Sequence, residues 1–477
     1  MIDKGLLKIK ILGDSGPFSK TGRSISYLIE IDDTAYILDI GSPVFQLLNF
    51  QQLNSISGVI CTHPHDDHKR WLTDFLLYRK YVTPNQPKLR LLTGYALMDE
   101  IRVSSRISLE KTLSPNSEKV VYLAYESFVD ETRISPAPKY SIKQITENNS
   151  NEYRVINSDG EIVKPDKAKV IVNRINNIPE ILFFDEECGK WVNPEIYYSF
   201  SDSIFYKKSF PFIDEKSGMK ITAVNAGTWH GITAVSIIVE YDNTKIYFSG
   251  DTVYNIDLWT KLYKNELTPK ADLASSEFLN SYCIKGDLND YIQLSWSEKR
   301  FCEALALYKE MDIIIHDSAA FNSIVHTDFC FCRDFDKNKT MLTHNPDKYI
   351  SFLPITYNDK QFAVKNKKIY EIADNNLYEL NADYYIKMNG KFFAGYKDPN
   401  GMHAILTKNG AMDLVEYNNN YGENAERIKL YEDVGGKYYS TETIGAGCIV
   451  IDNIPYNRKE LDNGNILLEK IENHRRI

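Results

Sequence analysis

Apolar and polar residues alternate along the first sixty positions in the manner of β-strands. Segments 7–12, 26–31 and 35–40 alternate with a period of two, and turn-forming residues separate them. Residues 42–53 change to the spacing of a short amphipathic helix, and residues 56–60 return to a strand pattern. This order predicts a β-meander, a helix and a further strand, and hence a sheet that helices cover on its outer face.

The pattern becomes irregular in the middle of the chain and regular again after residue 220. Helices are expected at 73–81 and 97–107, and an aromatic run at 197–208 favours ordinary strand packing over a base-stacking surface. Apolar strands follow at 236–240, 246–248, 313–316 and 340–343. We therefore expect a mixed α+β domain at 1–353 with a large insertion at approximately 82–220.

The last part of the chain has a different composition. Tyrosine and asparagine become frequent, and the dipeptides Asn389-Gly390 and Asn409-Gly410 lie between alternating segments, which is typical of β-hairpins. Residues 354–477 are expected to form a β-rich C-terminal module, whose role the sequence leaves unknown.

Candidate chemistry is concentrated directly after the strand at 56–60. The segment His63-Pro64-His65-Asp66-Asp67-His68 contains three of the nine histidines of the chain. Imidazole nitrogens and carboxylate oxygens are ligands of zinc and related divalent ions. A loop at the end of a strand is also a usual place for ligands on a rigid scaffold, so the segment predicts a metal site.

Few other histidines remain to complete such a site. No histidine lies between His68 and His230, so the insertion supplies no imidazole. The later candidates are His230, His316, His326, His344, His403 and His474. His403 is expected in a surface turn and His474 in a frayed terminus. A carboxylate, Asp251, follows the strand at 246–248 in the sequence Ser-Gly-Asp-Thr.

These motifs together resemble the metallo-β-lactamase superfamily. The spacing H-x-H-x-D-H, the Ser-Gly-Asp-Thr element and the opening segments with Gly16-Pro17 and Leu38-Asp39-Ile40-Gly41 are similar to its phosphodiesterase and tRNA 3′-endonuclease (tRNase Z-like) branch. The resemblance implies an αββα sandwich, two sheets with helices outside.

The resemblance also implies a role for each residue. His63, His65 and His230 would bind one metal, Asp67, His68 and His344 a second, and Asp251 would bridge both. His316 would assist at the scissile phosphate, although Asp317 and Ser318 depart from the family's His-Glu-Ala-Thr element, and His326 is an alternative for that role. Asp67 or Asp251 would accept a proton from a metal-bridging hydroxide or water. Zinc is the expected metal, with manganese and iron as alternatives.

Composition narrows the partners and the location. The 56 basic and 65 acidic residues give a net charge of −9, which disfavours a long polyanion as partner. The seven cysteines form no Cys-x-x-Cys pair, and no apolar segment has the length of a membrane span, so a cytoplasmic protein is expected. The insertion offers a surface for a homodimer.

The leading hypothesis is a dinuclear metal-dependent hydrolase, a phosphodiesterase for a small phosphodiester such as a cyclic nucleotide. Only some twenty residues separate His230 from Asp251, whereas the tRNA endonucleases usually carry a tRNA-gripping arm there. A nuclease acting on RNA or DNA, a lactonase or thioesterase, and a metal-stabilised binding module without catalysis are the alternatives.

Overall fold

The structure is a computed structural model of the chain. It describes residues 6–17, 23–110, 112–113, 121–147, 150–172, 179–208, 211–264, 266, 295–318, 325–327, 335 and 339–344, and beyond these the backbone of strands β18 to β29.

The first of two central sheets has nine strands in the order β20-β19-β18-β1-β2-β3-β4-β5-β6. Strands β1 to β3 pair antiparallel, as the alternating segments near the N-terminus predicted, and β3 to β6 pair parallel. The bounds are β1 Leu7–Gly13, β2 Ser26–Ile31, β3 Thr34–Ile40, β4 Ile56–Ile60, β5 Leu89–Thr93, β6 Val129–Arg133, β18 Gln361–Lys365, β19 Lys368–Ala373 and β20 Asn376–Glu379.

The second sheet has six strands in the order β12-β13-β14-β15-β16-β17. Its first strands pair antiparallel and β15, β16 and β17 pair parallel, so each sheet changes from antiparallel to parallel pairing along its width. The bounds are β12 Phe212–Ile213, β13 Lys220–Val224, β14 Ser236–Tyr241, β15 Thr244–Phe248, β16 Ile313–Asp317 and β17 Thr340–Thr343.

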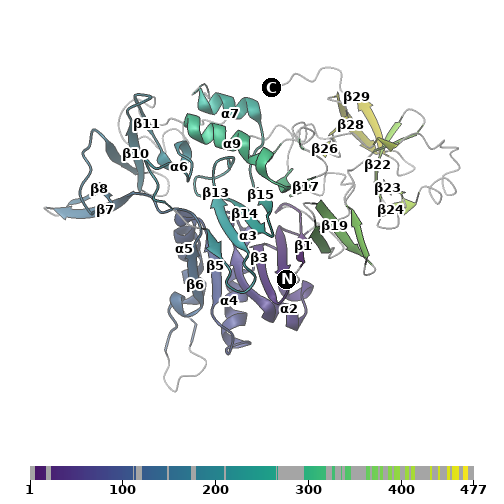
Figure 1. Cartoon of the computed structure of the whole chain (residues 1–477), viewed down its shortest axis with the longest axis horizontal. Coiled ribbons are helices and arrows are strands. Elements are labelled where there is room, and N and C mark those ends of the chain that lie inside the picture. Colours follow the sequence, from purple (N-terminus) through teal and green to yellow (C-terminus); the bar gives the residue numbers. More distant parts are fainter. Residues whose placement is uncertain are drawn as a thin grey trace.

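The two sheets pack face to face and helices cover the outside (Figure 1). Strand β15 shows how the sequence achieves this: Ile246 and Phe248 belong to the core that the two sheets share, whereas Tyr247 points to the opposite face. There it packs with Trp259 of α7 (Ile256–Tyr263) and Ala304 of α9 (Glu298–Glu310). Because side chains alternate along a strand, an entirely apolar strand is buried on both faces. The α+β sandwich expected from the sequence is therefore confirmed.

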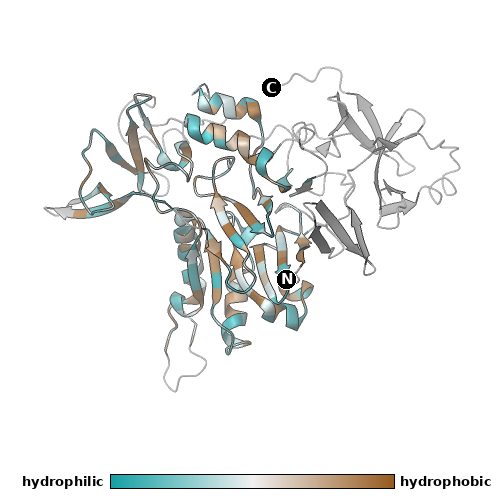
Figure 2. Ribbon diagram, viewed as in Figure 1, coloured by the Kyte–Doolittle hydropathy of each residue, from teal (hydrophilic) through white to brown (hydrophobic). Residues whose placement is uncertain are grey.

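Helices α4 (Leu72–Tyr81) and α5 (Tyr95–Leu109) accompany the first sheet, close to the ranges predicted. Figure 2 shows hydrophobic residues concentrated on the central strands and hydrophilic residues on much of the helical surface. The part of the chain that the structure describes contains no helix with the length and apolar character of a membrane span.

One predicted helix, at 42–53, is divided into two. Helix α1 (Val44–Leu47) ends where Leu48 adopts an extended backbone, and α2 (Phe50–Ser55) begins after Asn49. The Asn49 side chain accepts the backbone N–H of Gln52, and the Gln52 side chain accepts the backbone N–H of Asn49. This capping box starts a new helix where the amphipathic pattern alone indicated a continuous one.

Part of the segment predicted as an insertion, 82–220, belongs to the sandwich. Strands β5 and β6 are part of the first sheet, and α5 packs against them. Outside both sheets lie the hairpin of β7 (Tyr140–Glu147) and β8 (Ser150–Asn157), and a small sheet of β9 (Ala168–Val172), β10 (Pro179–Asp185) and β11 (Lys190–Val192). Helix α6 (Pro194–Tyr197) leads back to the sandwich. The aromatic run at 197–208 forms turns and a buried cluster instead of the strand expected. The Asp202 side chain accepts the backbone N–H of Ile204 within the run, and the Asn193 side chain accepts that of Glu195 just before it.

Strands of the C-terminal part are paired as the turn signals predicted. Asn389-Gly390 lies between the antiparallel strands β21 (Tyr385–Met388) and β22 (Lys391–Lys397). Further strands form two small sheets with the bounds β23 His403–Thr407, β24 Gly410–Asp413, β25 Leu430–Tyr431, β26 Tyr439–Ser440, β27 Cys448–Ile451, β28 Ile454–Glu460 and β29 Ile466–Lys470. However, β18 pairs with β1, which joins residues 361–379 to the first sheet. The division at residue 353 stays a prediction, with this attachment added.

The pairing of β18 with β1 generates a test of that division. A chain ending at residue 353 would leave β1 as an unpaired edge, and exposed edges promote association between molecules. We expect it to aggregate more and unfold at a lower temperature than a chain ending at residue 380, which keeps β18 to β20. Sedimentation and thermal unfolding measure both effects, and equal behaviour of the two chains would contradict the structural importance of the pairing.

Candidate metal centre

The strands of both sheets deliver polar side chains to one edge of the sandwich. His63 follows β4, Asp251 follows β15, and His344 follows β17. The carboxyl ends of parallel strands meet at the same edge of a sheet, so residues distant in sequence are brought together there. All seven predicted metal ligands lie at this edge, in two groups that could hold metal ions.

The first group consists of His63, His65, His230 and Asp251, whose ligand atoms all lie within 4.8 Å of one another. Nε2 of His63 is 3.3 Å from Oδ2 of Asp251, and Nε2 of His230 is 3.8 Å from the same oxygen. Nδ1 of His65 lies 3.3 Å from Nε2 of His230.

The second group consists of Asp67, His68, Asp251 and His344 within the same limit of 4.8 Å. Here the other oxygen of Asp251 is used: Oδ1 lies 3.1 Å from Nε2 of His68 and 3.4 Å from Nε2 of His344. Oδ2 of Asp67 is 3.5 Å from Nε2 of His68 and 3.4 Å from Nε2 of His344. The Asp251 carboxylate thus faces one group with each oxygen, as a bridging ligand would.

These spacings fit metal coordination better than hydrogen bonding. Ligands about 2.1 Å from a tetrahedral ion lie roughly 3.4 Å from one another. Among the described residues, Nε2 of His63, Nε2 of His68 and Oδ1 of Asp251 are buried without a hydrogen-bond partner, although oppositely charged atoms lie nearby. Buried polar atoms normally have partners, so atoms that converge without bonding indicate a place for a cation.

Hydrogen bonds on the far side of three rings orient them toward the two groups. Nδ1 of His230 lies 3.0 Å from the carbonyl oxygen of Val325, and Nδ1 of His63 lies 3.1 Å from the Thr62 hydroxyl. Nδ1 of His68 lies 2.7 Å from Oδ2 of Asp39. With Nδ1 donating in each ring, Nε2 keeps its lone pair for a metal ion.

The pKa shifts reflect the same concentration of negative charge. Burial opposes protonation of His344, but the carboxylates of Asp251 and Asp67 raise its pKa to about 9. Burial likewise opposes protonation of His68, whose pKa Asp251 and Asp39 nevertheless raise well above its usual value. Burial lowers the pKa of His230 to about 4. The second group therefore attracts positive charge strongly, which a divalent ion can supply in place of protons.

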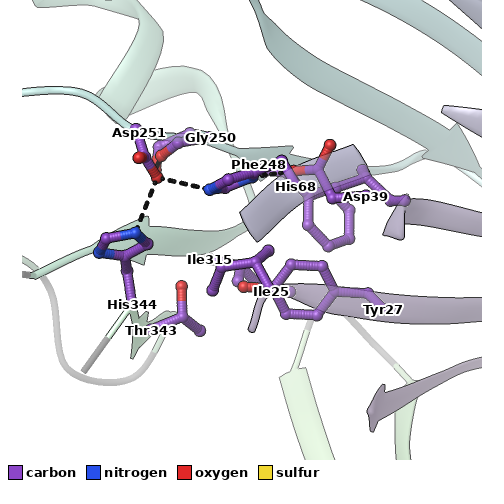
Figure 3. A pocket seen from close by; sticks show the side chains of 12 residues that line it. Ile25, Tyr27, Asp39, His68, Phe248, Gly250, Asp251, Ile315, Thr343 and His344 are labelled. Atoms are coloured by element: carbon purple, nitrogen blue, oxygen red, sulfur yellow. Dashed lines mark hydrogen bonds and ion pairs between the residues drawn. The ribbon is translucent and has the colours of Figure 1, made fainter. Parts of the chain in front are cut away.

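Asp39 is a supporting residue to which the sequence assigned no role. It is fully buried, and its carboxylate accepts the backbone N–H of Thr62 at 2.9 Å and the Thr62 hydroxyl at 2.8 Å. Figure 3 shows His68 between Asp39 and Asp251, with Asp251 also joined to His344. A carboxylate inside the apolar strand β3 was the signal available in the sequence, because a buried charge requires partners.

Two glycines let the backbone pass close to these groups. A Cβ atom at Gly41 would lie 1.6 Å from the carbonyl oxygen of Asp67, and one at Gly250 would lie 2.9 Å from Cβ of Thr62. Gly250 also has a φ of +60°, in the left-handed region. Glycine at position 41 therefore leaves room for the backbone of Asp67, and glycine at position 250 allows the turn that carries Asp251.

His316 is not at the centre, contrary to its predicted place near the reacting phosphate. Its ring is completely buried, with Nε2 2.9 Å from the Tyr308 hydroxyl and Nδ1 2.8 Å from the Asp317 carbonyl oxygen. The alternation of side chains along β16 turns His316 toward α9 and the next residue, Asp317, toward the metal groups.

His326, the alternative, does lie beside the centre. Its Nδ1 is 2.8 Å from Oδ2 of Asp317 and 4.0 Å from Oδ2 of Asp251, and its ring stacks on that of His344. Asp317, His326 and His344 form a further group with metal-ligand spacing. Of the two remaining histidines, His474 lies outside the described residues and only the backbone of His403 is described, in β23.

Arg300 on α9 is a second supporting residue that the sequence did not reveal. Its side chain is buried and donates hydrogen bonds to five backbone carbonyl groups. The acceptors belong to α6 and to the loop that leads to His230; they are Glu195, Ile196, Asn225, Ala226 and Thr228. One guanidinium therefore ties the insertion, the second helical layer and a candidate ligand loop together.

Comparison with known protein families identifies one partial match. Residues 7–158 match the family model described as "Anti-Pycsar protein Apyc1". This range includes four of the seven candidate ligands. A search of curated proteins found no match.

Solved structures similar to this chain include proteins of the metallo-β-lactamase fold. The metallo-β-lactamase fold protein YhfI from Bacillus subtilis is 11% identical, with a TM-score of 0.36, over 72% of this chain and 88% of its own. Human tRNase Z, short form, is 12% identical, with a TM-score of 0.33, over 72% and 93%. A diphosphatase from the PhnP family is 10% identical, with a TM-score of 0.31, over 71% and 87%.

The two groups generate a prediction on metal content. The wild-type chain should bind two divalent ions, His230→Ala one, and Asp251→Asn neither tightly, because Asp251 belongs to both groups. Chelation should lower the unfolding temperature, since an ion at a hundred times its dissociation constant stabilises by about 2.7 kcal/mol. Elemental analysis and thermal unfolding test this. Asp66→Asn, a change at an exposed neighbouring carboxylate, is the control, and unaltered metal content in Asp251→Asn would contradict the assignment.

Arg300 generates a second prediction. Arg300→Met should reduce the free energy of unfolding by at least about 2 kcal/mol, because several buried carbonyl groups lose their donor and each costs roughly 1–3 kcal/mol. It should also weaken metal binding at the group that contains His230 more than at the other. Arg79→Met is a matched control: Arg79 is also buried but donates to the Ile56 carbonyl only, so a smaller loss and unchanged metal affinities are expected. Denaturant unfolding and metal titration separate the two effects.

Proposed function

We propose that the protein is a dinuclear metal-dependent phosphodiesterase that acts on a small phosphodiester such as a cyclic nucleotide. The observation that carries the proposal is the placement of Asp251, whose two carboxylate oxygens face two separate groups of imidazoles. A carboxylate shared in this way suits two ions at the short separation typical of phosphodiester hydrolysis.

In this proposal His63, His65 and His230 hold one ion, Asp67, His68 and His344 hold the other, and Asp251 bridges them. Two such ions, with zinc expected and manganese or iron as alternatives, supply an acidified water and stabilise negative charge on the phosphate. Asp67 is suited to receive the proton that the water loses. Although burial opposes ionisation, the neighbouring His344 and His68 hold the pKa of Asp67 well below its usual value, so the carboxylate is ionised, as a metal ligand or a proton acceptor must be.

His326 takes the role for which the sequence favoured His316. Its side chain is about one-fifth exposed, so a substrate can reach it, whereas His316 is enclosed. The Asp317 carboxylate lies 2.8 Å from Nδ1 and orients the ring. An imidazole N–H beside the metal groups can donate a hydrogen bond to the leaving oxygen or to the phosphate oxygens on which negative charge develops.

The surroundings of the centre support a small substrate. The interval between His230 and Asp251 is filled by the hairpin of β14 and β15, which turns at Asp242 and Asn243 and leaves no long arm there. Two exposed acidic residues are close to the centre. Asp66 follows His65 in the sequence, and Glu100 accepts a hydrogen bond from the Thr233 hydroxyl. The net charge of −9 disfavours a long polyanion as substrate. A nucleic acid therefore remains the alternative substrate, and a lactone or thioester the next.

The test is turnover of a substrate panel by the metal-loaded chain, with 3′,5′-cyclic nucleotides, dinucleotides, a tRNA precursor and a lactone. We expect hydrolysis of a cyclic nucleotide, and loss of turnover in His65→Ala and Asp251→Ala without loss of the fold as judged by circular dichroism. His326→Ala should lower kcat by a factor of about 10² to 10⁴, the usual contribution of a general acid.

Two control variants sharpen this experiment. Asp66→Ala removes an exposed carboxylate next to Asp67 and should leave turnover unchanged, whereas Asp67→Ala should abolish it. His316→Gln should affect stability more than kcat, because the ring is buried against α9. No turnover of any phosphodiester would overturn the proposed function, and a larger kcat effect in His316→Gln than in His326→Ala would overturn the role of His326.

A further inference from the structure

Three of the functional residues at the metal-centre edge lie on loops and not on strands. The loops and their residues are 225–235 with His230, 249–255 with Asp251, and the segment 325–327 with His326. A strand holds its residues through a regular hydrogen-bond ladder, whereas a loop keeps a side chain in place only through specific bonds to its surroundings. The arrangement of these three residues therefore depends on the bonds between the loops.

The Thr252 hydroxyl joins the first loop to the second. Its oxygen accepts the backbone N–H of Trp229 at 2.8 Å, and it donates to the carbonyl oxygen of Gly227 at 3.1 Å. Thr252 follows Asp251 directly in the sequence, and Trp229 comes directly before His230. One side chain thus connects the neighbours of two candidate ligands whose own atoms, Nε2 of His230 and Oδ2 of Asp251, lie 3.8 Å apart.

The Thr327 hydroxyl joins the second loop to the third segment. It donates to the carbonyl oxygen of Thr252 at 2.9 Å and accepts the backbone N–H of Tyr254, also at 2.9 Å. Thr327 follows His326 directly in the sequence. The Asp317 carboxylate orients the ring of His326, whereas Thr327 fixes the backbone that carries this ring.

Both threonines are fully buried, with 0% of their surface exposed. A hydroxyl can donate one hydrogen bond and accept others, so each threonine satisfies one carbonyl and one N–H group of a loop. Valine has nearly the same shape but neither bonding function, and it would leave these buried backbone groups without partners. Serine keeps both functions, so the two substitutions distinguish the hydroxyl from the shape of the side chain.

We propose that Thr252 and Thr327 are positioning residues that fix the loops of His230, Asp251 and His326 in the arrangement that metal binding and catalysis require. The proposal rests on the proposed function and extends it from the ligands to the residues that hold them in place. Both threonines act through other residues: Thr252 through the first metal group, and Thr327 through His326.

The first test measures the zinc affinity of the metal-free chain by titration against a competing chelator. Thr252→Val should weaken binding of the ion in the first group by about 10- to 100-fold, the usual effect of losing a group that orients a metal ligand. His230→Ala identifies that ion in the titration, because His230 belongs to the first group only. Thr252→Ser should bind zinc as the wild-type chain does. Equal weakening in the valine and serine variants, or none in either, would overturn the role of the Thr252 hydroxyl.

Thr83→Val is the matched control. Thr83 is also buried, at 7% exposure, and its hydroxyl donates to the carbonyl oxygen of Arg79 at 3.3 Å, but it follows α4 and belongs to none of the three loops. This variant should unfold at a lower temperature and keep the zinc affinities of the wild-type chain. A loss of zinc affinity as large as that in Thr252→Val would indicate a general effect of stability and contradict the proposal.

The second test is a double-mutant cycle between Thr327 and His326. At saturating zinc, Thr327→Val should lower kcat for the preferred phosphodiester by a smaller factor than His326→Ala does. In the His326→Ala background the same substitution should have no further effect on kcat, since residues that act as one unit are not additive. Thr327→Ser should keep the wild-type kcat. Additive losses, or an unchanged kcat in Thr327→Val, would overturn the role of Thr327.

The two readouts keep this proposal distinct from the proposed function. If no phosphodiester is hydrolysed, the proposed function fails, and the zinc titration still decides the role of Thr252. If a phosphodiester is hydrolysed and Thr252→Val binds zinc as the wild-type chain does, the positioning role fails and the phosphodiesterase stands. If circular dichroism shows that Thr252→Val does not fold, the cycle with Thr327 decides whether the hydroxyls position the loops.

Discussion

The concentration of buried carboxylates at one edge of the sandwich is the constraint on which the rest of the structure depends. Asp39, Asp67, Asp251 and Asp317 are all buried there. An ionised carboxylate in a protein interior is very unfavourable without positive partners. Asp39 is satisfied by Thr62 and His68, whereas Asp251 faces ring nitrogens with which it forms no good hydrogen bonds. Cations between these groups would complete the arrangement.

The sandwich meets this constraint by drawing ligands from both sheets. His63 to His68 follow the first sheet, and His230, Asp251 and His344 belong to the second. Each of the two metal groups includes residues of both sheets. A bound ion would therefore link the sheets across their shared core, and correct packing of that core is in turn required for either group to form.

Layers outside the sandwich act on the same edge through few contacts. Arg300 connects α9 with α6 and with the loop before His230, so the metal centre and the insertion share one buried anchor. The carbonyl oxygens of Glu195 and Ile196 in α6 both accept from this anchor. In this way the insertion is held in a fixed position relative to the loop that carries His230.

Local patterns were sufficient for some of these features and not for others. The sequence was sufficient to predict the strands near the N-terminus, because strand periodicity depends on neighbouring residues. It also indicated the His and Asp residues that could bind metal and their positions at the ends of strands. The division of the helix at 42–53 and the inclusion of β5 and β6 in the first sheet were missed, since a capping side chain and long-range strand pairing decided them.

The choice between His316 and His326 shows the same limit. His316 lies within β16 and His326 in a segment after it. Motif spacing favoured His316, but the face of β16 on which His316 falls turns its ring toward Tyr308 of α9, whereas His326 meets Asp317. Arg300 and Asp39 likewise acquire their roles from groups far away in the sequence. The sequence by itself determined which residue types are available for metal chemistry, whereas only the tertiary structure decided which of them meet, because burial and partner geometry are set by contacts between distant segments.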